Sequence, residues 1–139
     1  MVKSGKVGAI IQARVQSRRL PGKVLLSLPY GSGISIIENI IRRISVVSGI
    51  DAVIIATSDR PENDDVVSVA RAAGAEVFRG SEDDVLDRFH KAAVLHGVAD
   101  IVRLTADNPF VDPVMLDACL KAQKKSKADY TKTISIPRE

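Results

Sequence analysis

Aromatic residues are scarce in this 139-residue chain: tryptophan is absent, and phenylalanine and tyrosine together account for 4% of the residues. A hydrophobic core must therefore be built from isoleucine, valine, leucine and alanine. The scarcity also leaves few side chains on which nucleic-acid bases could stack, which argues against a nucleic-acid-binding module.

Cysteine and long apolar runs are also lacking. Cys119 is the single cysteine, so an internal disulfide bond is excluded, and a small packing residue is the expected role. No apolar run approaches the ~18 residues of a membrane-spanning helix, and no signal-peptide pattern follows Met1–Lys6. We therefore expect a cytoplasmic protein with no membrane partner, whose length is that of one domain.

Charge of one sign is in only slight excess, with a net charge of +3 at neutral pH. This excess does not by itself indicate a nucleic-acid partner. One basic cluster falls in a predicted loop and could contact phosphate: Arg14, Arg18, Arg19 and Lys23. A second cluster follows a predicted helix and is interpreted as a solvated surface: Lys121, Lys124, Lys125, Lys127 and Lys132.

Short apolar segments alternate along the chain with segments of helical periodicity. Strands are predicted at residues 7–12, 51–57, 76–79 and 100–104, with a possible fifth at 129–134 and a short strand or turn at 24–28. Helices are predicted at about 34–47, 65–73, 82–96 and 114–125, the first capped by Ser35 with Glu38 and the third by Ser81. The alternation predicts an α/β fold around a mostly parallel sheet.

Ligands of such sheets bind outside the carboxyl ends of the strands, so the segments after the strands are candidate sites. The loop 13–23 offers Arg14, Arg19 and Lys23, and clustered cations suit a triphosphate. Gly22 would let the backbone approach a ligand closely. A solvated basic loop explains the pattern equally well, and the loop matches neither a P-loop nor a G-x-G-x-x-G motif.

Several acidic residues have two interpretations. Asp107 follows the fourth predicted strand, where a ligand is expected, but Asp-Asn-Pro is also a good turn. Asp59 and Arg60 could line the same cleft, or Asp59 could only shape the turn before Pro61. The remaining candidates are interpreted as helix-start, surface or structural residues: Asp83, Asp84, Asp87, His90 and His96.

One segment carries a family resemblance. IIQARVQSRRLPGKVL (residues 10–25) resembles the opening of the cytidylyltransferases that include CMP-Kdo synthetases, CMP-sialic acid synthetases and, as the most similar branch, spore coat polysaccharide biosynthesis proteins. Four more segments are similar: VIIATSDRPEND, AGAEVFRGSEDDVLDRF, ADIVRLTADNPFVDP and ADYTKT. The resemblance implies one nucleotide-binding domain over residues 1–139, with a three-layer α/β/α, nucleotide-diphospho-sugar transferase-like (Rossmann-like) fold.

The resemblance also implies a reaction. An oxygen of a sugar acid or related sugar would attack the α-phosphate of CTP, releasing pyrophosphate in surface polysaccharide biosynthesis. Arg14, Arg19 and Lys23 would hold the triphosphate, with Arg14 and Lys23 in the catalytic role. Ala13 would approach the nucleotide through its backbone.

Three further positions take implied roles. Gly80 and Ser81 would help enclose the base or ribose, and Asp107 would bind Mg²⁺ through the family's D-x-P motif. A homodimer is the family expectation.

This chain departs from the family pattern in two ways. Its loop reads Gln16, Ser17, Arg18, Arg19 where Gly-Ser-Thr-Arg is usual, so Arg18 adds a cation. Its relatives are also longer, which implies that only the N-terminal part of the fold is present. The second half would supply the sugar pocket, much of the dimer contact and a second metal-binding aspartate. A non-catalytic nucleotide-binding or assembly remnant therefore stands beside the enzyme hypothesis.

Overall fold

The computed structural model describes residues 5–133. Four strands, β1 (Lys6–Gln12), β2 (Ala52–Ser58), β3 (Glu76–Gly80) and β4 (Val98–Thr105), form one sheet in the order β3-β2-β1-β4. Every neighbouring pair is parallel, so the predicted parallel sheet is confirmed. Each of the four main predicted strands overlaps one of these strands.

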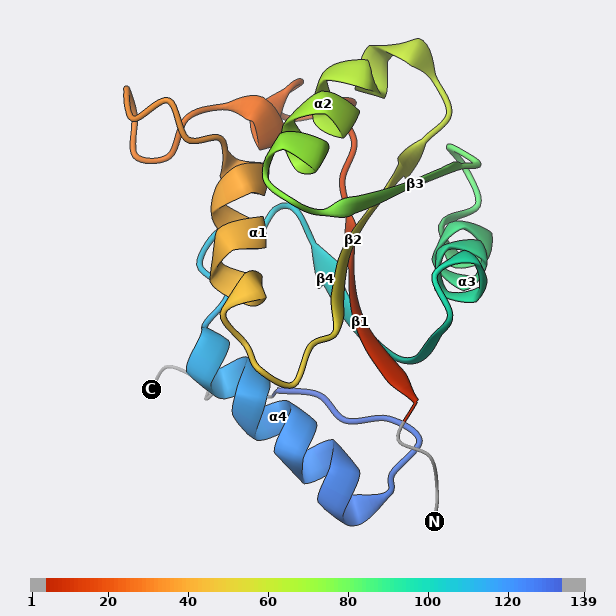
Figure 1. Ribbon diagram of the computed structural model, residues 1–139. Helices are drawn as coiled ribbons and strands as arrows, with labels where there is room; N and C mark the ends of the chain where they lie inside the picture. Colours follow the sequence, from red (N-terminus) through yellow and green to blue (C-terminus); the bar gives the residue numbers. More distant parts are fainter. Residues whose placement is uncertain (1–4, 134–139) are drawn as a thin grey trace.

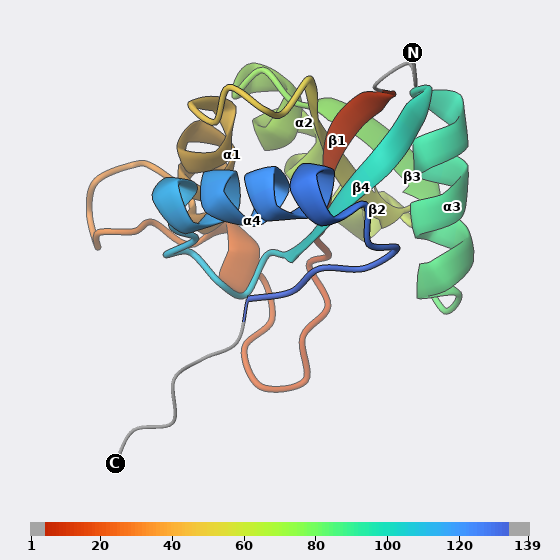
Figure 2. The same ribbon diagram turned by 90° about the horizontal axis from the view of Figure 1, so that it is seen from below.

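Helices cover both faces of the sheet. The helices α1 (Ile36–Ser45) and α2 (Asp64–Ala72) lie on one face and α3 (Val85–Leu95) lies on the other (Figure 1). The fourth helix, α4 (Pro113–Ser126), lies on the α1 side, where Leu116 packs against the core (Figure 2). Two short 3₁₀ turns complete the described elements: η1 (Lys23–Leu25) and η2 (Pro61–Asn63). The predicted three-layer α/β/α architecture is confirmed.

Two aliphatic cores fill the spaces between the layers. On the α1 side, Ile37, Ile40, Ile41 and Ile44 recur at helical spacing and are almost completely buried. On the α3 side, strand residues pack against Phe89, Ala92 and Ala93 of that helix. Burying an isoleucine side chain stabilises a fold by roughly 1.5–3 kcal/mol. Isoleucine therefore supplies the hydrophobic stabilisation that aromatic residues supply in many cores.

Two predicted local structures differ from the observed ones: the cap of α3 and the possible fifth strand. Ser81 does not cap α3: Asp84 does, because its carboxylate accepts from the Asp87 amide, while the Ser81 hydroxyl accepts from the Asp84 amide in the preceding turn. Of the two alternatives for residues 24–28, the turn is confirmed, because this segment forms the end of η1 and a single bridge, Ser27 to Ser35.

The possible fifth strand is also absent from its described part, residues 129–133. This segment folds back on α4 instead, where the Thr131 hydroxyl donates to the Gln123 side chain. Ile134 lies outside the described residues.

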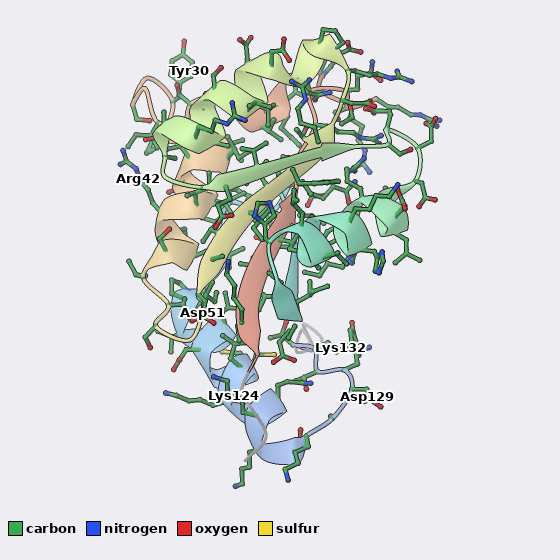
Figure 3. The ribbon with its side chains drawn as sticks, turned by 45° about the vertical axis from the view of Figure 1, so that its right-hand side comes forward. Tyr30, Arg42, Asp51, Lys124, Asp129 and Lys132 are labelled. Carbon is green, nitrogen blue, oxygen red and sulfur yellow. The ribbon has the colours of Figure 1, made fainter. Side chains whose placement is uncertain are left out.

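Exposed tyrosine and lysine side chains lie at the two ends of the molecule. Tyr30 is fully exposed in the loop after η1, and Tyr130 is also exposed. Lys124 and Lys132 lie at the opposite end from Tyr30, around the last turn of α4 (Figure 3). Among the helices of residues 5–133, none has the length and apolar character needed to cross a lipid bilayer.

Candidate functional site

The sheet has a topological switch point at β1. The chain runs outward from β1 to β2 and β3, and β4 then pairs with the free side of β1. The strand order therefore reverses at β1, and the segments that follow β1 and β4 lie side by side at the carboxyl edge of the sheet, where open α/β sheets bind ligands. The Ala106 amide donates to the Gln12 carbonyl at 3.0 Å and holds the roots of these two segments together.

The loop after β1 is held in a defined shape. Its ends meet where the Gly22 amide donates to the Val15 carbonyl at 2.8 Å, and the left-handed backbone at Gly22 (φ 72°) favours glycine. The Val15 amide in turn donates at 2.9 Å to the side chain of Asn63, which is completely buried. A side chain from η2 therefore anchors the start of the loop.

A first hollow of about 410 Å³ lies between this loop and the segment after β4. It gathers five of the predicted site residues: Ala13, Arg14, Arg19, Lys23 and Asp107. Residues 16–18 of the loop and Thr105 form much of the remaining wall. Cations from one segment thus face a carboxylate from the other across a space that can hold a charged ligand.

Asp107 carries the negative charge of this hollow. A hydrogen bond of 2.5 Å from the Thr105 hydroxyl lowers the pKa of Asp107, partial burial opposes this, and Lys23 and Arg19 lower the pKa further. The carboxylate is therefore ionised at neutral pH and can serve as an oxygen ligand for Mg²⁺. No group of three potential metal ligands occurs within residues 5–133, so phosphate oxygens or water would have to complete the shell of such a metal.

A second hollow of about 430 Å³ lies on the other side of the loop. Arg14 and Arg18 line both hollows, and Arg60, Glu82 and Asp83 complete the second. Arg60 thus lines the second hollow and not the one that holds Asp107. Asp59 lines neither hollow.

Gly80 and Ser81 lie beside the second hollow without lining it. A Cβ atom at Gly80 would come within 2.7 Å of the Phe78 ring, so packing accounts for glycine at this position. The Ser81 carbonyl accepts a 2.5 Å hydrogen bond from Arg88 of α3, and the Ser81 hydroxyl shapes the turn before that helix.

Glu82 is an important residue that sequence reasoning missed. It stands in an acidic run that resembles a solvated helix start, yet it is 8% exposed. Its Oε1 accepts from Arg14 Nη1 at 3.1 Å. Burial raises the pKa of Glu82, but the Ser58 hydroxyl and the charges of Arg14 and Arg60 outweigh this and leave the pKa lowered.

The histidines and the cysteine lie outside both hollows. His96 contacts the Glu76 carboxylate where β3 begins, at the opposite edge of the sheet from the loop, and His90 is exposed. Cys119 is half-buried on α4.

The model of one protein family, described as cytidylyltransferase, matches residues 8–138. This chain belongs to the cytidylyltransferase family. It is 42% identical over 129 residues to spore coat polysaccharide biosynthesis protein SpsF of Bacillus subtilis, a match that covers 92% of this chain and 54% of that protein. The chain therefore spans about half the length of the curated relatives that it matches.

Solved structures of the family share the fold. A cytidylyltransferase from Leptospira borgpetersenii superposes with a TM-score of 0.77 at 36% identity, covering 84% of this chain and 48% of that one. A CMP:2-keto-3-deoxy-manno-octonic acid synthetase complexed with CTP superposes with a TM-score of 0.70 at 28% identity, covering 88% and 49%. The predicted nucleotidyltransferase-like fold is thereby confirmed.

Proposed function

We propose that this chain carries the CTP-binding part of an enzyme that transfers CMP from CTP to a sugar acid or a related sugar and releases pyrophosphate. The observation that carries the proposal is the grouping of Arg14, Arg19 and Lys23 opposite Asp107 at the switch point of the sheet. Guanidinium and ammonium groups suit phosphate oxygens, and this edge is the place where such sheets bind ligands.

In the proposed reaction an acceptor oxygen attacks the α-phosphorus of CTP. The bond from this phosphorus to the oxygen that bridges to the β-phosphate breaks, pyrophosphate leaves with the bonding electrons, and the acceptor proton passes to solvent. Such a transfer depends on positioning and charge neutralisation. Arg14 and Lys23 neutralise the charge that develops on the phosphates, and Arg19 holds the triphosphate.

The nucleoside is assigned to the side of the loop where the second hollow lies. Ala13 begins the loop, with its amide donating to the Ala56 carbonyl at 3.2 Å, so its backbone is fixed beside the path of the nucleotide. Gly80 and Ser81 enclose the base or ribose from the turn after β3. Arg14 lines both hollows and would contact the nucleotide where nucleoside and phosphates join.

Mg²⁺ is the proposed cofactor, with Asp107 as its protein ligand. An ionised, exposed carboxylate beside cations that favour phosphate fits this ion, because Mg²⁺ commonly takes one or two carboxylates and fills its shell with phosphate oxygens and water. When bound, the ion would neutralise phosphate charge. The single carboxylate predicts that Mg²⁺ binds together with the nucleotide and not before it.

Calorimetry with CTP, ATP, GTP and UTP in the presence of Mg²⁺ tests the binding part of the proposal. We expect CTP to bind in preference to the other three. Lys23→Met and Arg14→Met should each weaken CTP binding by about tenfold or more, since each removes a charged contact. Lys124→Met and Arg42→Met, which remove cations remote from the loop, should leave it unchanged (Figure 3). No binding of CTP by the wild-type chain would refute the proposal.

A second function, nucleotide binding or assembly without turnover, is favoured by the loop after β1, where Arg18 adds a cation that lines both hollows. A pyrophosphate-release assay with CTP and a panel of sugar acids separates the two functions. Release that depends on both CTP and a sugar acid supports the transferase, whereas CTP binding without release supports the second function.

The biological setting is also a proposal. The name of the Bacillus subtilis relative refers to spore coat polysaccharide biosynthesis, which supports a role of this chain in surface polysaccharide synthesis. A cytoplasmic location and a homodimer are part of the same proposal. Sedimentation of the purified chain at several concentrations tests the homodimer.

A further inference from the structure

Arg88 of α3 is completely buried. Its Nη1 donates to two backbone carbonyls, that of Ser81 at 2.5 Å and that of Glu82 at 3.3 Å. Its Nε and Nη2 are buried and have no hydrogen-bond partner among residues 5–133. Removing a guanidinium from water costs several kcal/mol, so a nearby negative charge must compensate this arginine.

Glu82 supplies that charge. Burial lowers the pKa of Arg88, and the charge of Glu82 opposes this. The same carboxylate accepts from Arg14 Nη1 at 3.1 Å. Glu82 therefore links two guanidinium groups: its carboxylate accepts from Arg14 of the loop after β1, and its backbone carbonyl accepts from Arg88 of α3.

We propose that Glu82 and Arg88 are positioning residues. They hold Arg14 and the Gly80–Ser81 turn in a fixed position relative to each other, so that both can bind the nucleotide. This inference rests on the proposed function. Arg88 lines neither hollow and Glu82 is negative, so neither is suited to contact a triphosphate directly. Glu82 acts through Arg14, whose side chain is 45% exposed and whose remaining N–H groups stay available for phosphate. Arg88 acts through the carbonyls of the turn.

A double-mutant cycle distinguishes this positioning role from a purely structural one. Glu82→Gln should weaken binding of CTP with Mg²⁺ by about tenfold, because groups in contact couple energetically. In the Arg14→Met background the same change should cause little further loss. Cytidine, which has no phosphates, should lose much less affinity than CTP. Additive losses in the cycle, or equal losses for CTP and cytidine, would overturn the role of Glu82.

Arg88→Lys tests the second residue. It keeps the charge beside Glu82 but offers a single ammonium where the guanidinium reaches two carbonyls. Because the turn is assigned to the nucleoside, this variant should weaken CTP and cytidine binding alike. Unchanged cytidine binding in a folded Arg88→Lys variant would contradict the assignment.

Trypsin cleavage after Arg18 and Arg19 gives a readout that needs no nucleotide. Glu82→Gln should speed this cleavage, because the loop loses its contact through Arg14. Glu38→Gln is the matched control, since it breaks an arginine–glutamate pair on the surface of α1. Unchanged cleavage in Glu82→Gln refutes the inference whether or not CTP binds, whereas faster cleavage without any CTP binding by the wild type refutes only the proposed function.

If Glu82→Gln fails to fold, judged by circular dichroism, Glu82→Asp replaces it in all these measurements. Aspartate keeps the negative charge, but its side chain is one methylene shorter, so the carboxylate lies farther from Arg14. Faster trypsin cleavage and weaker CTP binding are again expected. Wild-type behaviour of this variant in both measurements would overturn the inference.

Discussion

At the scale of single residues, the candidate site is built from charges whose partners lie far away in the sequence. Asp107 receives a hydrogen bond from a neighbour in its own segment, but the cations that lower its pKa come from the loop after β1. The same loop reaches Glu82 through Arg14. Each of these groups is therefore set by contacts between segments, and single substitutions should act on binding in separable ways.

Substitution of Asp107 should act through the metal. Asp107→Asn should abolish the increase in CTP affinity on adding Mg²⁺, because the amide lacks the charge that the ion requires. Affinity measured without Mg²⁺ should stay the same or rise, since one negative charge near the phosphates is removed. Calorimetry with and without Mg²⁺ checks this, with Asp87→Asn on the outer face of α3 as control. A full Mg²⁺ response in Asp107→Asn would contradict the assignment.

Glu82 should make the stability of the protein depend on acid pH. The pKa of Glu82 in the folded chain lies below its ordinary value of 4.5, because Ser58, Arg14 and Arg60 outweigh the effect of burial. A lowered pKa stabilises the folded state above pH 4.5, and this contribution is lost as the pH falls from 4.5 through the folded pKa. The gap in unfolding free energy between the wild type and Glu82→Gln should therefore shrink below that pH. Urea denaturation at several pH values measures the gap, and a constant gap would contradict the prediction.

The residues that sequence reasoning missed share one physical cause. Asn63 and Arg88 are completely buried, and Glu82 nearly so, although such polar residues are usually exposed. Their burial arises from packing between distant segments: Asn63 and Glu82 contact the loop after β1, and Arg88 contacts the turn before α3. No local pattern encodes that packing. The basic loop and Asp107, in contrast, were predictable because the position of a residue directly after a strand determines its edge of the sheet.

At the scale of elements, local patterns were sufficient for most boundaries. The helical spacing of the isoleucines in α1 and the Ser35 cap predict that helix, and the Ser35 hydroxyl accepts from the Glu38 amide at 3.2 Å. The strand order was not predictable, because β1 pairs with β4 across a long stretch of sequence. The predicted start of α3 was wrong because Ser81 and Asp84 both satisfy the sequence pattern of a helix cap.

The four helices should differ in local stability. α1 buries four isoleucines, whereas α4 has no buried residue despite its 14 residues. Helical stability in proteins comes mainly from packing, and weakly packed elements open at low free energy. Hydrogen exchange followed by mass spectrometry should show α4 exchanging faster than α1. Equal protection of the two helices would contradict this view of α4.

At the scale of the whole molecule, the two basic regions lie apart. One surrounds the loop after β1, at the top of Figure 1, and the other lies around the end of α4, at the bottom. With a net charge of only +3, the local arrangement matters more than the total. The lysines of α4 should therefore contribute little to nucleotide binding.

Salt should separate the charged part of the ligand from the rest. Raising the ionic strength should weaken CTP binding severalfold and leave cytidine binding nearly unchanged, because only the triphosphate interacts with the loop cations. Lys124→Ala with Lys125→Ala should leave this salt response as in the wild type. Titrations at low and high salt measure it, and a salt-independent CTP affinity would contradict the assignment of the loop.

Because the chain has so few aromatic residues, its intrinsic fluorescence is weak. The sequence has no tryptophan, and its two tyrosines are exposed outside both hollows. Leu20 lines the first hollow and is 47% exposed, so it offers room for a larger side chain. Leu20→Trp would place the only indole of the chain on the wall of that hollow. The fluorescence of this indole, excited where tyrosine does not absorb, would report ligand binding without a background signal from the core.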